Sequence, residues 1–182
     1  MPVSREDGQR TLESLQVSTR SPMGALAFHT GGLLVDHGWL RILGGGCDEF
    51  PRALDRWNHV GATPRCHHGL LIADDLVGGF FAWFREPRTI HYLAPDTLEW
   101  EDLGFGYTDW LRWTFTEAFR TFASDFRWDG WEKEVPRADQ ALGIYPPLFT
   151  EKSHISKRAR RAVPIDEVWL LINQFADQLR TE

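Results

Sequence analysis

The sequence predicts an α+β protein with a mainly antiparallel twisted sheet of about six or seven strands and with helices packed mostly on one face. Short apolar runs separated by turn residues fill roughly the first hundred positions. Apolar residues at helical spacing follow over residues 107–122 and 164–179. Because most connections between the predicted strands are tight turns, neighbouring strands must run antiparallel. Strands first and helices last are typical of the α+β class.

The centre of the predicted sheet is a β-meander over residues 69–103. Asp74, Asp75 and Gly78 supply turn chemistry between two apolar runs. Residues 98–103 place acidic side chains between apolar ones, as a strand does when one face is buried and the other meets water. The four strands of this meander are predicted at residues 70–73, 79–84, 89–93 and 98–103.

The N-terminal part of the chain begins with polar and charged residues. Residues 1–11 are therefore predicted to form a flexible tail, and residues 12–182 a single domain. A short helix over residues 9–17 is a minor element at this boundary. Further strands are predicted at residues 23–30, 33–35 and 39–43, followed by a short helix at residues 50–58 with Asp48 as its N-cap.

The C-terminal half changes from strand to helix patterns. An amphipathic helix is predicted over residues 107–122, where apolar side chains recur every three or four positions. Pro136, Gly143 and the pair Pro146-Pro147 then predict an irregular crossing. A last helix over residues 164–179 begins with a proline and two acidic residues, which favour a helix N-terminus.

The composition limits the classes of function. The 182 residues include 20 Lys and Arg against 26 Asp and Glu, so the net charge is −6. This charge argues against general nucleic-acid binding and favours a basic partner. No apolar run reaches the roughly 20 residues that span a bilayer, and residues 1–10 lack the apolar core of a signal peptide. No membrane association is predicted, and the expected compartment is the cytoplasm.

Two turns carry side chains that could perform acid–base chemistry or bind a metal. They hold Asp36, His37, Asp74 and Asp75. A small hydrolase or metal-dependent enzyme would need these groups to converge in one pocket. The alternative is structural, because Asp side chains are favoured in hairpin turns, where they bond the local backbone. The sequence leaves both interpretations open.

Two cysteines, Cys47 and Cys66, lie near turn residues and lack the CxxC spacing. Reduced thiols of a cytosolic protein are the favoured interpretation, with a disulfide between them as the alternative. Cys66 and His68 would share one face of a strand, but a structural zinc site usually shows two close ligand pairs, and only one is present. No metal, cofactor or catalytic residue is therefore predicted.

Four segments resemble a known family. They are residues 15–25 (LQVSTRSPMGA), 38–44 (GWLRILG), 71–81 (LIADDLVGGFF) and 92–100 (YLAPDTLEW). The chain resembles, over residues 12–168, an uncharacterised bacterial family described as a domain of unknown function, DUF2625. Members of that family usually carry further helical sequence before the first segment, so the resemblance implies a shortened N-terminal region.

A weaker similarity, of layout more than motif, is to the SUKH superfamily. Its members are α+β domains that serve largely as immunity proteins, which bind and neutralise bacterial toxins. Residues 96–113, a strand that turns into an aromatic-rich helix, are similar in character to the end of such domains. This similarity implies a protein-binding function.

Two classes of function follow. The first is a non-catalytic module whose acidic and aromatic surface binds a basic protein partner such as a toxin. The second is the small hydrolase or metal-dependent enzyme described above. Exposed strand edges and surplus aromatic residues are also compatible with a homodimer. The predicted binding residues are Asp36, His37, Trp39, Asp74, Asp75, Glu99, Trp100 and Glu101.

Overall fold

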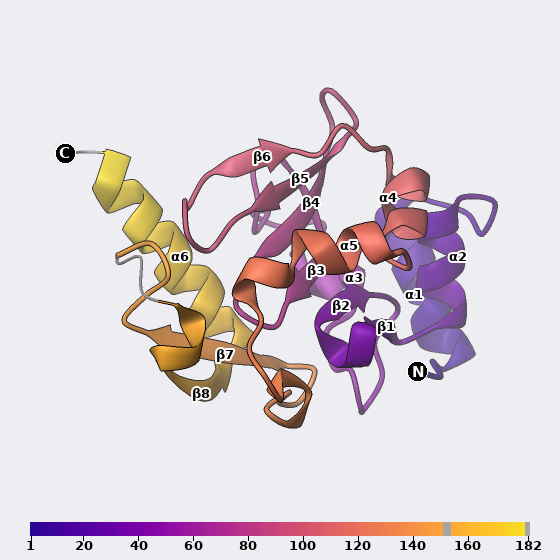
Figure 1. Ribbon diagram of the computed structural model, residues 1–182. Coiled ribbons are helices and arrows are strands. Elements are labelled where there is room, and N and C mark those ends of the chain that lie inside the picture. The colour runs from indigo at the N-terminus through magenta and orange to yellow at the C-terminus, as the bar shows by residue number, and fades with distance from the viewer. Residues whose placement is uncertain (151–153, 181–182) are drawn as a thin grey trace.

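A computed structural model of the chain describes residues 1–150 and 154–180. It contains a six-stranded antiparallel sheet, a separate two-stranded hairpin and a set of mostly short helices (Figure 1). The predicted α+β class and the mainly antiparallel sheet are confirmed. Nowhere in these two ranges is a helix long and apolar enough to cross a membrane.

The six-stranded sheet is a simple meander. Each strand pairs in antiparallel fashion with the next strand along the chain, so the spatial order equals the sequence order. The first and last strands therefore form the two edges of the sheet. The strands are β1 (Gly32–Val35), β2 (Leu40–Leu43), β3 (Gly69–Asp75), β4 (Phe80–Phe84), β5 (Ile90–Leu93) and β6 (Trp100–Asp102).

Helices lie on both sides of this sheet. They are α1 (Arg5–Leu15), α2 (Pro22–His29), α3 (Leu54–Trp57), α4 (Tyr107–Trp113), α5 (Glu117–Phe122) and α6 (Ile165–Arg180). Short 3-10 turns add η1 (Asp36–Gly38), η2 (Ser124–Phe126), η3 (Trp131–Lys133) and η4 (Ile155–Lys157).

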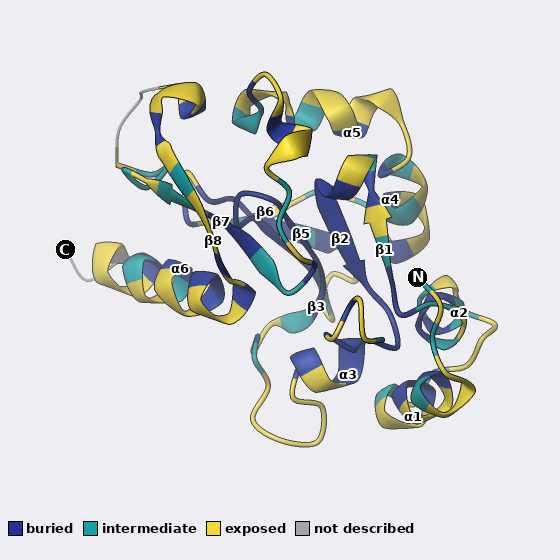
Figure 2. Ribbon diagram, turned by 90° about the horizontal axis from the view of Figure 1, so that it is seen from below, coloured by how far each residue is buried: buried dark blue, intermediate teal, exposed yellow. Residues whose placement is uncertain are grey.

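Two consecutive residues of β4 show how the two faces are covered. Successive side chains of a strand point to opposite faces of a sheet. The ring of Phe80 contacts Trp169 of α6 at 4.9 Å between centroids, whereas the ring of Phe81 contacts Trp110 of α4 at 5.6 Å. Figure 2 shows α6 and α3 on the side of the sheet opposite α4 and α5. The structure thus differs from the prediction of helices mostly on one face.

The N-terminal segments fold as helices. The predicted flexible tail over residues 1–11 is largely α1, whose first turn is capped by the Ser4 hydroxyl accepting from the backbone N–H of Asp7. Thr11 and Leu12 of this helix are buried. The predicted strand over residues 23–30 is also wrong. That segment is α2, which Ser21 caps in the same way.

The predicted helix over residues 107–122 is two helices. Thr114 and Thr116 stand between α4 and α5, and their hydroxyls donate to the carbonyl oxygens of Leu111 and Trp113. Such bonds offer the backbone an alternative to the helical ladder. Thr116 has an extended backbone conformation and serves as the N-terminal boundary of α5.

A second hairpin replaces the predicted irregular crossing. Strands β7 (Gln140–Tyr145) and β8 (Ala159–Pro164) pair in antiparallel register, with Gly143 opposite Arg161. The last predicted helix is confirmed as α6, which follows β8 directly. The predicted helix over residues 50–58 is only the single turn α3, and Ala53 rather than Asp48 precedes it.

Candidate functional site

Asp74 lies at the centre of a buried ionic cluster. Its carboxylate is 1% exposed and pairs with the guanidinium groups of Arg41 and Arg52. Arg52 also donates to the carbonyl oxygen of Ala138 at 2.8 Å, and Arg41 donates to that of Gln140. Buried charges are stable when they are paired and hydrogen-bonded. We call Arg41, Arg52 and Asp74 the Asp74 cluster, and its role is to fasten the segment before β7 to the sheet.

Asp75 is equally buried and bonds a different set of groups. Its carboxylate accepts from the Tyr92 hydroxyl at 2.7 Å and from the backbone N–H groups of Val77 and Gly79 at 3.0 and 2.7 Å. Burial raises the pKa of Asp75 above its ordinary value, and these three donors act in the opposite direction. The pKa of Tyr92 is raised well above its ordinary value by burial and then by the nearby Asp75 carboxylate. Asp75 therefore organises the β3–β4 turn.

Asp36, in the β1–β2 turn, forms ion pairs with arginines of α5 and of the segment after η2. Its carboxylate pairs with Arg127 and, at 3.5 Å, with Arg120 of α5. His37 beside it is exposed, and its ring lies 6.5 Å from that of Trp131. The guanidinium of Arg127 also lies over Trp39, whose side chain is buried in the core.

The four groups of the hydrolase hypothesis do not come together. In the described part of the chain, no hydrogen bond or ion pair connects Asp36 or His37 to Asp74 or Asp75. Each carboxylate is bound by arginines, a tyrosine or backbone N–H groups instead. Only Asp75 bonds the backbone of its own turn, whereas Asp36 and Asp74 bind arginines from other segments. Trp39, Asp74 and Asp75 are too buried to contact a partner.

The cysteines do not form a cluster with the histidines. Cys47 and Cys66 are free thiols, and burial raises the pKa of Cys66. Among the residues that the structure describes, no group of three or more His, Cys, Asp or Glu side chains could hold a metal ion.

The remaining predicted binding residues lie together on the free edge of the sheet. Glu99 and Glu101 are exposed, and Trp100 is half-buried with its ring 5.2 Å from that of Phe84. Strand β6 pairs with β5 on one side only, and Figure 1 shows no strand beyond it. Glu99, Glu101 and the exposed Asp96 form no ion pair within the described ranges. We call residues 96–101 the β6 edge.

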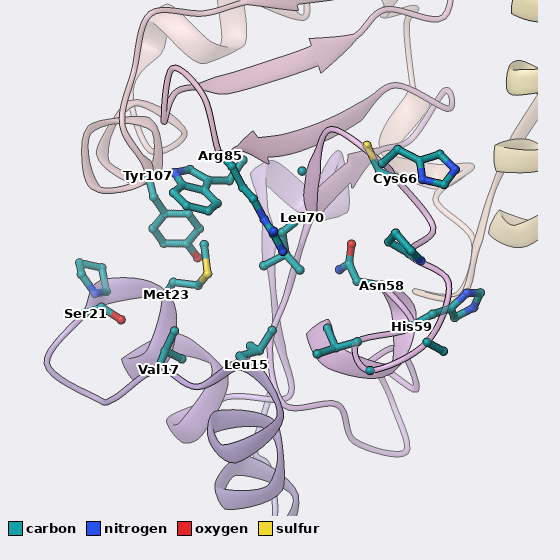
Figure 3. Close-up of a pocket in the computed structure, with 18 of the residues that line it drawn as sticks. Leu15, Val17, Ser21, Met23, Asn58, His59, Cys66, Leu70, Arg85 and Tyr107 are labelled. Atoms are coloured by element: carbon teal, nitrogen blue, oxygen red, sulfur yellow. The ribbon is translucent and has the colours of Figure 1, made fainter.

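A second candidate site is a cavity that lies away from the β6 edge and was not predicted. Its volume is about 680 Å³, and it opens between the α1–α2 connection, the loop before β3 and the end of β4 (Figure 3). Such a cavity depends on distant segments meeting in space, and no local sequence signal marks it. Its lining includes Leu15, Val17, Met23, Asn58, His59, Cys66, Leu70, Trp83, Arg85 and Tyr107.

Comparisons with known proteins agree with the resemblance inferred from the four segments. The family model described as "Protein of unknown function DUF2625" matches residues 1–168. The "Putative uncharacterized protein YbfG" of Escherichia coli K12 is 36% identical over 190 residues, covering 97% of this chain and 84% of that protein. An "Uncharacterized protein" of Haemophilus influenzae is 34% identical over 176 residues, covering 89% and 76%. No solved structure matches significantly.

Proposed function

This chain belongs to the DUF2625 family, and we propose that it is a non-catalytic binding protein that captures a basic segment of a partner protein at the β6 edge. The observation that carries this proposal is the set of carboxylates on that edge that have no cation partner in the described ranges. Elsewhere in the sheet, Asp74 is neutralised by two arginines. The β6 edge is therefore the part of the sheet whose negative charge is left for another molecule.

The backbone of the edge strand also favours binding of a partner segment at the β6 edge. Alternate residues of an edge strand carry N–H and C=O groups that the neighbouring strand does not use. An extended segment of a partner can add to such an edge as a further strand, with its side chains alternating between the two faces. Lysine and arginine side chains at those positions would meet Glu99 and Glu101. Trp100, on the opposite face of the strand, would supply an apolar contact.

A basic toxin is the partner that we favour. The layout resembles that of the SUKH immunity domains, and the net charge of −6 favours encounter with a basic protein. Electrostatic steering of this kind weakens as salt rises, because the Debye length falls to about 8 Å at physiological ionic strength.

The test compares two charge-reversed variants in affinity capture from the native cell lysate at low and moderate salt. Glu99→Lys with Glu101→Lys changes the β6 edge. Glu49→Lys with Glu132→Lys alters the net charge by the same amount at exposed carboxylates that lack ion partners in the described residues. Mass spectrometry identifies the retained proteins, and titration with the purified partner measures affinity.

We expect a basic protein to bind the wild type and the Glu49/Glu132 variant, and to be lost from the Glu99/Glu101 variant. Equal loss in both variants would show that only net charge matters and would contradict the proposal. Retention by the Glu99/Glu101 variant would place the partner elsewhere. A second copy of the same chain at this edge would instead appear as a homodimer in size-exclusion chromatography.

A further inference from the structure

We propose that the cavity between the α1–α2 connection and the end of β4 binds a small amphipathic molecule that carries one carboxylate. The cavity volume of about 680 Å³ lies within the roughly 300–1,000 Å³ usual for small-molecule sites. Its walls are mainly apolar, as in most such sites. The apolar side chains that line it include Leu15, Val17, Pro22, Met23, Val60 and Leu70.

Arg85 supplies a cation that no other residue in the described ranges neutralises. It follows β4 directly, is exposed, and takes part in no hydrogen bond, ion pair or ring contact within those ranges. Figure 3 shows its side chain extending across the cavity toward Leu70. A guanidinium held beside an apolar wall matches the planar geometry of a carboxylate, which it can bind through two parallel hydrogen bonds.

Tyr107 supplies a hydroxyl without a partner. The residue is 9% exposed, and its hydroxyl oxygen is buried and forms no hydrogen bond with any residue that the structure describes. Buried polar groups are nearly always hydrogen-bonded, so an unsatisfied one indicates a missing partner. Figure 3 shows this hydroxyl pointing toward Met23 inside the cavity. Because Met is unbranched and adapts easily, its movement would let a ligand reach the hydroxyl.

Asn58 does not compete for this role. Its amide nitrogen donates to the carbonyl oxygens of Leu54 and Leu71, and its amide oxygen accepts from the N–H of Leu71. The lining also includes Ser21, His59, Cys66, His67 and Thr108. Among the described lining residues, however, the only permanent cation is the Arg85 guanidinium, and the buried hydroxyl without a hydrogen bond is that of Tyr107. One cation and one neutral donor suit a single carboxylate attached to an apolar body. Aliphatic and aromatic carboxylic acids share this chemistry.

The test is isothermal titration calorimetry of the full chain with octanoate and phenylpropionate. The uncharged analogues octanol and phenylpropanol serve as ligand controls. Arg85→Gln removes the cation, and Arg88→Gln removes an exposed arginine that does not line the cavity and has no partner among the described residues. Tyr107→Phe removes only the hydroxyl. Circular dichroism verifies that each variant is folded.

We expect a carboxylate to bind the wild type and Arg88→Gln equally. Arg85→Gln is expected to weaken carboxylate binding about tenfold to a hundredfold, the value of one charge-assisted hydrogen bond, and to leave the weak binding of the alcohols unchanged. Tyr107→Phe is expected to weaken it about threefold to tenfold. The better of the two acids identifies the ligand as aliphatic or aromatic.

The proposal is overturned if neither acid binds saturably, if Arg85→Gln binds the acid as tightly as the wild type, or if the alcohol binds as tightly as the acid. This site is independent of the β6 edge. The Glu99→Lys and Glu101→Lys variant is therefore expected to keep full affinity for the acid, so failure of one proposal leaves the other intact.

Discussion

Two pairs of acidic residues in the same sheet have opposite surroundings. Asp74 and Asp75 are 1% and 3% exposed, and arginines, a tyrosine hydroxyl and backbone N–H groups bind their carboxylates. Glu99 and Glu101 are exposed, with no ion pair in the described ranges. The difference shows that a carboxylate in the interior must be matched by donors of its own chain. A carboxylate on the exposed edge of the sheet can be solvated by water or can bind a partner.

The largest effect is expected from Asp74→Ala. This change leaves Arg41 and Arg52 buried without their common anion, and breaking a buried pair typically costs about 3–5 kcal/mol. We expect a loss of that size in the free energy of unfolding, measured by urea denaturation.

Asp129→Ala serves as the control, because Asp129 is exposed and forms no ion pair in the described ranges. Its expected change lies within about 0.5 kcal/mol. If Asp74→Ala lowers the free energy of unfolding by less than about 1 kcal/mol, the buried carboxylate behaves like an exposed one, and the contrast between the two pairs is wrong.

Tyr92→Phe is expected to have an intermediate effect. It removes the hydroxyl that donates to Asp75 at 2.7 Å and leaves the ring in place. Leaving a buried carboxylate short of one donor costs about 1–3 kcal/mol. Tyr145→Phe, at an exposed tyrosine, is the matched control in the same denaturation experiment. Equal stability of the two variants would contradict the role assigned to Tyr92.

The pH dependence of stability tests the surroundings of Asp75 directly. Burial raises the pKa of Asp75 from its ordinary value of 3.8, so the folded state holds this proton more tightly than the unfolded chain does. Its contribution to stability is full below that value and is lost as pH rises through the higher folded pKa. We expect the wild type to lose more stability than Asp75→Asn as the pH rises above the ordinary pKa of 3.8. Parallel curves would show that the pKa of Asp75 is not raised.

The smallest effect on stability is expected from Glu101→Lys. Its side chain is exposed and forms no ion pair with the described residues, so the free energy of unfolding is expected to change by no more than about 0.5 kcal/mol. Thermal unfolding of the variant and the wild type measures this. A clear loss of stability would mean that the Glu101 carboxylate stabilises the fold, and the contrast with Asp74 would disappear.

Local patterns were sufficient to predict most of the meander. The turn residue Gly78 falls between β3 and β4, although Asp74 and Asp75, predicted in the turn, are the last two residues of β3. An antiparallel meander needs only neighbouring contacts. The errors came from signals with two interpretations. Residues 23–30 were predicted as a strand, although the capping serine and the proline that precede them begin a helix, as they do at α2. Gly143 was interpreted as part of a crossing, although it lies in β7.

The candidate sites were harder to predict because they depend on distant contacts. Nothing local indicates that Asp74 meets Arg41 and Arg52, because the register of β2 on β3 and the path of the preceding loop decide it. The cavity beside Arg85 and Tyr107 joins four segments that are far apart in the chain. The exposed Glu99 and Glu101 could be predicted, since their alternation with apolar residues places them on the solvent side of a strand.

The Asp74 cluster also bears on the order in which the chain folds. Arg41 reaches the carbonyl oxygen of Gln140 across 99 positions, and Arg52 reaches that of Ala138 across 86. Forming contacts between such distant positions costs the entropy of closing a long loop. Each strand of the meander pairs with the next strand along the chain, so its loops are shorter and cost less entropy. The meander is therefore expected to form before the β7–β8 hairpin docks. Loss of these contacts to Ala138 and Gln140 would then chiefly accelerate unfolding and leave the folding rate nearly unchanged.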